Sequence, residues 1–154
     1  MPRKALFLDR DGTINADHGY VYRQEDFDFL PGIFELCARA QEKGYLIIVI
    51  TNQSGIARGF YTEEDYARLT AYMVGQFAER GIRICDVLHC PELSGPDRKP
   101  EPGLFLRAQR KHDIDMAASV SVGDKPRDIE AATRAGCGAN FLYQDSFNPI
   151  IQAL

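Results

Sequence analysis

Short apolar runs recur along the chain and alternate with longer stretches in which apolar and polar residues mix. A buried strand of a parallel sheet reads as a continuous apolar run, whereas a helix at a surface carries apolar residues three and four apart. The runs predict strands at 6–8, 45–50, 85–90, 119–122 and 139–142, and the intervening stretches predict helices at 31–43, 62–80, 102–111 and 126–135. Strands that alternate with helices predict an α/β fold, with a parallel sheet, right-handed crossovers and helices on both faces.

The longest predicted helix, 62–80, carries a start signal of its own. Thr62 and Asp65 have the spacing of a capping box, and Gly81 follows as a stop signal. The apolar positions then recur at intervals of three and four, which is typical of a face that packs on a core. These positions are Tyr66, Leu69, Tyr72, Met73 and Phe77. We therefore assign this face to the core and not to a ligand.

Composition narrows the class of protein. The 154 residues predict a single domain over 1–154, and 45% apolar with 26% charged residues is ordinary for a globular protein. No apolar run approaches the roughly 20 residues that span a bilayer, and the first strand begins too early for a signal peptide. We expect a cytoplasmic monomer without a membrane partner. The net charge of −4 argues against nucleic acid as the main partner but not against small anions.

The cysteines indicate a reducing environment. None of the four has a partner at Cys-x-x-Cys spacing, so we expect free thiols that pack in the fold. They are Cys37, Cys85, Cys90 and Cys137.

The first strand runs directly into Asp9-Arg10-Asp11-Gly12-Thr13. Open α/β sheets bind ligands beyond the carboxyl ends of their strands, so Asp9 and Asp11 are candidates for chemistry. Two carboxylates on one side can share Mg²⁺, and Arg10 should point away from them if the chain is still extended there. A calcium loop also begins in this way, but its twelfth residue should be acidic, and here that residue is Tyr20.

Three further strand ends carry polar side chains. Thr51 to Ser54 follow the second strand, Arg98 and Lys99 follow the third, and Asp124 and Lys125 follow the fourth. In a parallel sheet these ends share one edge, where they would bring carboxylates, hydroxyl groups and cations around one point. Transfer of a phosphoryl group needs a nucleophile, an acid for the leaving group and positive charge for the phosphoryl oxygens.

The order of these motifs resembles the haloacid dehalogenase (HAD) superfamily. Asp-x-Asp-Gly-Thr, a Thr after a strand, a Lys and a Gly-Asp after a strand occur in that order over residues 4–143. The resemblance implies a Mg²⁺-dependent phosphatase with a Rossmann-like three-layer sandwich. The stretches Asp-His-Gly-Tyr, Thr-Asn-Gln-Ser-Gly-Ile-Ala-Arg-Gly and Arg-Lys-Pro are similar to the sugar-bisphosphate phosphatases of that superfamily.

The resemblance also implies roles for individual residues. Asp9 would be the nucleophile and Asp11 the general acid and base, with Thr51 and Lys99 on the phosphoryl oxygens. Mg²⁺ would lie between Asp9, the backbone carbonyl of Asp11 and Asp124. The implied substrate contacts are Asp17, His18, Gly19, Tyr20, Asn52, Gln53, Ser54, Arg98 and Lys125.

The roles of two further arginines are not decided by the sequence. Arg58 is compatible with either a solvated surface or a phosphate contact. Arg127 lies at a predicted helix start, where the helix dipole does not favour a cation, so a ligand contact is favoured.

The chain departs from its relatives after the third strand. Many of them carry a zinc loop there, but His89 and Cys90 cannot supply the four ligands of a structural zinc site, so we expect a short loop without zinc. The two intervals that could hold a cap domain are filled by a hairpin-like flap (residues 14–30) and by predicted helices and strands. We therefore expect an open site without a large cap.

The resemblance implies removal of the 7-phosphate from a heptose 1,7-bisphosphate during synthesis of lipopolysaccharide precursors. Histidinol phosphate or another small sugar phosphate is the alternative substrate. From another class, a receiver-type domain also uses carboxylates, a Thr and a Lys on a parallel sheet, but its acceptor Asp follows a middle strand, whereas Asp9 follows the first. An inactive relative that only binds a ligand is disfavoured by the complete set of catalytic residues.

Overall fold

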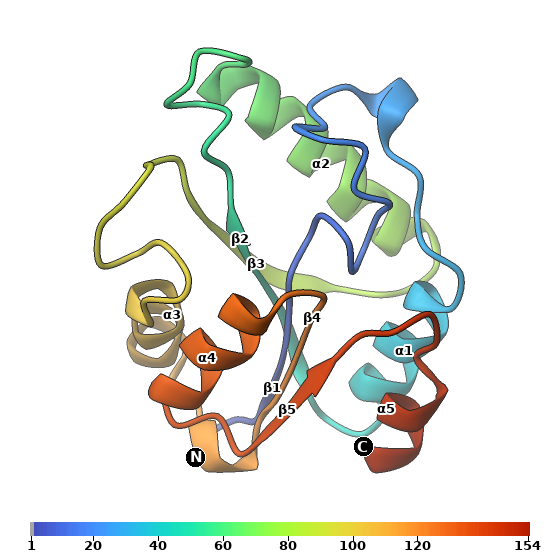
Figure 1. Cartoon of the computed structure of the whole chain (residues 1–154). Coiled ribbons are helices and arrows are strands. Elements are labelled where there is room, and N and C mark those ends of the chain that lie inside the picture. Colours follow the sequence, from blue (N-terminus) through green and yellow to red (C-terminus); the bar gives the residue numbers. More distant parts are fainter. Residues whose placement is uncertain (1) are drawn as a thin grey trace.

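The computed structural model describes residues 2–154 and contains a five-stranded parallel sheet in the order β3-β2-β1-β4-β5 (Figure 1). The strands are β1 (Ala5–Leu8), β2 (Leu46–Asn52), β3 (Ile84–Cys90), β4 (Val120–Gly123) and β5 (Ala139–Leu142). The predicted strands are confirmed. Because β1 lies in the middle of the sheet, the residues that follow it lie between the loops that follow β2 and β4.

The helices cover both faces of this sheet. They are α1 (Ile33–Glu42), α2 (Glu63–Glu79), α3 (Gly103–His112), α4 (Pro126–Arg134) and α5 (Asn148–Ala153), with short 3₁₀ turns at Gln24–Asp26 and Met116–Ala118. Buried residues of α1, α2 and α5 share one core cluster, and those of α3 and α4 share another. The predicted three-layer α/β architecture is confirmed.

The two clusters follow from the alternation of side chains along β1. Leu6 and Leu8 belong to the cluster under α1, α2 and α5, while Ala5 and Phe7 belong to the cluster under α3 and α4. All four are at most 1% exposed. Burial on both faces explains why the strand is apolar throughout, and it makes β1 a rigid base for the polar residues that come next.

Two local predictions need correction. The helix α5 was not expected, although Asn148-Pro149 begins it and Ile150 joins the core beside α1. The flap is an irregular loop and not a hairpin, because a single antiparallel bridge between Asn15 and Phe29 closes its base. Its interior is held by side chains instead of a ladder of backbone hydrogen bonds.

Nothing large covers the sheet edge above β1. Across residues 2–154 the intervals between elements hold only loops and the flap, so the described chain contains no large cap. None of its helices combines the length and the apolar character needed to cross a membrane. All four cysteines are free thiols.

The predicted capping box of α2 is present. The Thr62 hydroxyl accepts a hydrogen bond from the Asp65 amide at 3.1 Å, and the Asp65 carboxylate accepts one from the Thr62 amide at 2.9 Å. These bonds satisfy backbone donors that have no partner within the helix.

We therefore expect Thr62→Ala to lower the free energy of unfolding by about 1 kcal/mol, the usual cost of losing such a cap. Urea denaturation of the wild type and the variant measures the difference. Ser94→Ala, at an exposed loop position, is the matched control and should change stability by less than about 0.5 kcal/mol. Equal stabilities of wild type and Thr62→Ala would show that the box contributes nothing.

Candidate active site

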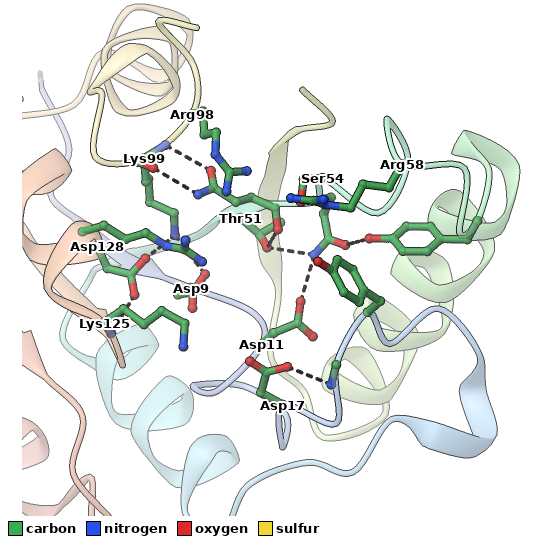
Figure 2. A pocket seen from close by; sticks show the side chains of 16 residues that line it. Asp9, Asp11, Asp17, Thr51, Ser54, Arg58, Arg98, Lys99, Lys125 and Asp128 are labelled. Carbon is green, nitrogen blue, oxygen red and sulfur yellow. Dashed lines mark hydrogen bonds and ion pairs between the residues drawn. The ribbon is translucent and has the colours of Figure 1, made fainter. Parts of the chain in front are cut away.

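A cleft of about 420 Å³ opens at the carboxyl ends of the strands, where the sequence predicted a site (Figure 2). It draws residues from the β1 and β2 ends, the flap, the loop before α3 and the start of α4. The predicted residues that line it are Asp9, Asp11, Asp17, Gly19, Tyr20, Thr51, Asn52, Gln53, Ser54, Arg98, Lys99 and Lys125. The fold thus gathers segments that lie far apart in the chain, from Asp9 to Asp128.

Lys99 is the buried cation of this cleft. Its side chain is 2% exposed, and its Nζ lies 2.8 Å from Asp9 Oδ1, 2.7 Å from Asp128 Oδ1 and 2.7 Å from the Ile50 carbonyl oxygen. An ammonium group has three protons to donate, and these three acceptors use all of them. The neighbouring carboxylates raise the pKa of Lys99 above its usual value against the opposing effect of burial, so the amine stays charged.

Three carboxylates meet beside this ammonium. Oxygens of Asp9, Asp124 and Asp128 lie within 4.8 Å of one another. Burial raises the pKa of Asp9 well above its usual range, and Asp128 and Asp124 add to that effect while Lys99 opposes it. Asp124 Oδ1 is buried without a hydrogen-bond partner among the described residues.

These features fit a divalent cation. Lys125 Nζ lies 3.7 Å from Asp124 Oδ2, so three carboxylates and two ammonium groups leave a formal surplus of one negative charge. Hard oxygen ligands are those that Mg²⁺ prefers. Gly12 completes the pocket, since a Cβ at this position would lie 2.0 Å from Asp124 Oδ2 and the residue has φ +90°. Any side chain at position 12 would displace the Asp124 carboxylate.

The carboxylate of Asp11 is surrounded by donors. Arg10 Nη2 lies 3.0 Å from both of its oxygens, Asn15 Nδ2 lies 3.0 Å from Oδ1, and Gln53 Nε2 lies 3.0 Å from Oδ2. The expectation that Arg10 points away from the carboxylates is wrong for Asp11. The chain turns after Asp9, so Arg10 does not follow the alternation of a strand, and its buried side chain also donates to the Val21 carbonyl in the flap at 2.7 Å.

Two residues after β2 have different surroundings. Thr51 is 1% exposed, and its hydroxyl accepts a hydrogen bond from Gln53 at 2.9 Å. The Asn52 amide is occupied by the backbone of Lys99, since its Oδ1 accepts from the Lys99 amide at 3.0 Å and its Nδ2 donates to the Lys99 carbonyl at 3.2 Å. Asn52 therefore fixes the segment that carries Lys99, and a substrate would have to compete with these two bonds to reach it.

Two predicted residues, Asp124 and His18, are not among those that line the cleft, although Asp124 belongs to the carboxylate cluster. His18 Nε2 lies 2.7 Å from Asp28 Oδ2, and the His18 side chain is half exposed. Its flap neighbours Asp17, Gly19 and Tyr20 do line the cleft, and Tyr20 packs against the exposed ring of Phe60 with centroids 4.8 Å apart.

The short loop after β3 is held by protein contacts. His89 faces Glu63 at 2.7 Å and stacks on Tyr66, while the Cys90 thiol points to the Glu92 carbonyl, so these two side chains do not converge on one point. An ion pair of 2.6 Å between Asp97 and Arg107 fixes the loop to α3. Among the described residues, the three carboxylates at the cleft are the single cluster with metal-ligand spacing.

Sequence reasoning missed three residues of the site. Asp128 lies four residues after Asp124, in the first turn of α4, and a second carboxylate so close to the predicted one could have suggested it. Tyr61 and Asn15 carry no such signal, because their roles depend on which loops meet. Arg58 and Arg127, which the sequence left open, both line the cleft.

Comparison with known proteins agrees with this geometry. A family model for HAD-hydrolase-like proteins matches residues 97–147. The chain is 47% identical to D-glycero-alpha-D-manno-heptose-1,7-bisphosphate 7-phosphatase of Campylobacter jejuni over 146 residues, which cover 94% of this chain and 85% of the relative. It is 46% identical to D-glycero-beta-D-manno-heptose-1,7-bisphosphate 7-phosphatase of Vibrio cholerae, covering 94% and 83%.

A solved structure is also similar. The crystal structure of D,D-heptose 1,7-bisphosphate phosphatase from B. bronchiseptica, complexed with magnesium and phosphate, has a TM-score of 0.85 and 32% identity to this chain, covering 97% of this chain and 86% of that one.

The carboxylate cluster predicts that Mg²⁺ stabilises the folded protein. A ligand at a hundred times its dissociation constant adds about 2.7 kcal/mol, which raises Tm by several degrees for a chain of this size. Asp124→Asn should abolish the Tm increase that Mg²⁺ causes in the wild type, because one ligand charge is lost. Thermal melts with and without Mg²⁺ measure it, and Asp28→Asn, at an exposed carboxylate outside the cluster, is the control. A full increase in Asp124→Asn would remove Asp124 from the metal site.

Proposed function

The chain belongs to the family of HAD-like phosphatases that contains the D-glycero-D-manno-heptose-1,7-bisphosphate 7-phosphatases, and we propose that it removes the 7-phosphate of such a heptose bisphosphate in a Mg²⁺-dependent reaction. The observation that carries the proposal is that Asp9, Asp11, Thr51 and Lys99 line one cleft. We place the reaction in the cytoplasmic synthesis of sugar precursors for surface polysaccharides.

In the first step the Asp9 carboxylate attacks phosphorus. A P–O bond to Asp9 forms and the P–O bond to the sugar breaks, while Asp11 gives a proton to the departing sugar oxygen. Lys99 and the Thr51 hydroxyl bind the phosphoryl oxygens during this transfer, after Lys99 exchanges one of its present acceptors for the substrate.

In the second step water attacks the aspartyl phosphate. Asp11 accepts a proton from that water, and phosphate leaves as the P–O bond to Asp9 breaks. Asp9, the backbone carbonyl of Asp11 and Asp124 would hold Mg²⁺, with Asp128 beside them. The bound cation would offset the negative charge that builds up on the transferring phosphoryl group.

The positive charge around the cleft supports a substrate with two phosphates. Arg58, Arg98 and Arg127 line it, and none of them makes a salt bridge within the described chain. A single phosphate beside Lys99 would leave these guanidinium groups without an anion. A second phosphate at the far end of a sugar gives them one, and an arginine can bind it with two parallel hydrogen bonds.

A short loop after β3, for which we expect no zinc, and a described chain without a large cap leave the cleft open. A small sugar bisphosphate fits a cleft of about 420 Å³, and loop residues of this chain contact it without a covering domain. Specificity would then rest on the flap, the residues after β2 and the loop before α3.

Asp9→Asn tests the nucleophile. The amide is a far weaker nucleophile than a carboxylate, so phosphate release from the heptose bisphosphate should fall below detection while the fold is retained. Colorimetric phosphate assays measure turnover, and thermal melts check the fold. Asp145→Asn, at an exposed carboxylate near the C-terminus, is the matched control. Retained turnover in Asp9→Asn would remove the assignment.

Arg127→Gln tests recognition of the second phosphate. The loss of one charge-assisted contact, about 1.5–3 kcal/mol, should lower kcat/KM for the heptose 1,7-bisphosphate by roughly 10- to 100-fold and leave the heptose 7-phosphate unchanged. Both anomers are assayed, and histidinol phosphate is included as the rival substrate. Arg110→Gln, on the exposed side of α3, is the control.

Two outcomes would contradict this proposal. An equal loss for the bisphosphate and the monophosphate would show that Arg127 does not bind the second phosphate. A higher wild-type kcat/KM for histidinol phosphate than for either heptose anomer would change the substrate while leaving the phosphatase chemistry.

A further inference from the structure

The side chain of Gln53 joins two residues of the proposed machinery. Its Nε2 lies 3.0 Å from Asp11 Oδ2 and 2.9 Å from Thr51 Oγ1, and these two bonds are the ones that its amide protons make. Both protons of the amide are therefore used inside the protein, and the residue is 2% exposed. Because its donors are occupied and its side chain is buried, Gln53 is better placed to orient Asp11 and Thr51 than to bind a substrate.

Tyr61 fixes the direction in which this amide faces. Its hydroxyl donates a hydrogen bond to Gln53 Oε1, so the NH₂ group and not the carbonyl oxygen is turned toward the Asp11 carboxylate. Burial raises the pKa of Tyr61 to about 12, which keeps the hydroxyl protonated and able to donate at neutral pH. Without this donor the amide would lose the partner that specifies its orientation.

The backbone makes room for this tyrosine. A Cβ at position 55 would lie 2.2 Å from Cε1 of Tyr61, so Gly55 allows the ring to approach the loop after β2. On the other side Tyr61 stacks on Tyr22 of the flap, with centroids 5.4 Å apart and an interplanar angle of 13°. The hydroxyl is thus held between two loops that both border the cleft.

We propose that Gln53 and Tyr61 are positioning residues that hold the Asp11 carboxylate toward the sugar oxygen that leaves. This inference rests on the proposed function, because it assumes that Asp11 delivers the proton. A carboxylate can rotate about its last bond, and a proton is transferred only over about 3 Å. Arg10 and Asn15 hold Oδ1, while Gln53, itself fixed by Tyr61, holds Oδ2 together with Arg10.

The nature of the leaving group separates this role from a structural one. The sugar oxygen of the heptose bisphosphate is a poor leaving group that needs a proton, whereas p-nitrophenolate leaves without one. Both substrates form the same aspartyl phosphate, so they differ only in the first step, which kcat/KM reports. A misplaced Asp11 should therefore lower kcat/KM for the bisphosphate and spare kcat/KM for p-nitrophenyl phosphate. A general loss of structure should slow both.

The experiment measures kcat/KM of Gln53→Met and Tyr61→Phe with the heptose 1,7-bisphosphate and with p-nitrophenyl phosphate. We expect both variants to lose about 10- to 100-fold for the bisphosphate, the scale of a misplaced catalytic group. Tyr61→Phe should lose less than about threefold for p-nitrophenyl phosphate, whereas Gln53→Met also removes the donor to the Thr51 hydroxyl and should lower that rate as well. Tyr61→Phe keeps the ring and its stacking on Tyr22, so it removes the hydroxyl alone. Thermal melts report whether each variant folds.

Tyr66→Phe is the matched control. Tyr66 is also a buried tyrosine, but its hydroxyl makes no hydrogen bond to Gln53 or Asp11 in the described part of the chain. Its removal should leave both rates unchanged.

The variant Asp11→Asn tests the premise, that Asp11 protonates the leaving group, separately from the positioning role of Gln53 and Tyr61. Asp11→Asn removes the base of the second step for both substrates, so the first step is measured in a single turnover, as release of the heptose monophosphate or of p-nitrophenolate. If Asp11→Asn slows this step equally for both substrates, Asp11 does not protonate the leaving group and the proposed mechanism fails. If Asp11→Asn spares the first step with p-nitrophenyl phosphate but Tyr61→Phe loses both reactions equally, or loses neither, the positioning role alone is overturned.

Discussion

The buried ammonium group of Lys99 is the interaction on which the rest of the site depends. A lone charge in the interior is costly, and this one is stabilised because three acceptors from three different segments surround it. The same three contacts bring Asp9 at the end of β1, Asp128 on α4 and the last residues of β2 to a common centre. The arrangement that satisfies one cation therefore also assembles the carboxylates that could bind a metal.

The sheet makes this assembly possible, because its central strand ends at the centre of the cleft. Asp9 and Asp11 follow β1, and the neighbours β2 and β4 supply the residues on either side. Lys99 comes from an irregular loop, and here polar contacts fix its position. Asn52 binds the Lys99 backbone on both sides, and the Asp97–Arg107 ion pair fixes the loop to α3. These contacts hold the lysine in place.

The flap has a second role besides lining the cleft. Arg10 connects Asp11 to the Val21 carbonyl, and Tyr61 connects Gln53 to the ring of Tyr22. Two separate sets of side-chain contacts thus connect Asp11, the candidate general acid and base, to the flap, which has almost no backbone pairing of its own. The position of Asp11 is consequently set by side-chain contacts across loops, and not by the strand from which it emerges.

The sequence by itself determined the strands, four of the five helices and the presence at one sheet edge of Asp9, Asp11, Thr51 and Lys99. It could do so because burial on two faces, helical periodicity and caps are local patterns, and parallel strands end at the same edge. Only the tertiary structure decided that Arg10 turns toward Asp11, that His18 faces Asp28, that Asp128 joins Lys99 and that Tyr61 reaches Gln53. Each of these contacts depends on which loops meet in the fold and on which buried polar group still lacks a hydrogen-bond partner. The spacing of residues along the chain predicts neither the meeting of the loops nor the missing partner.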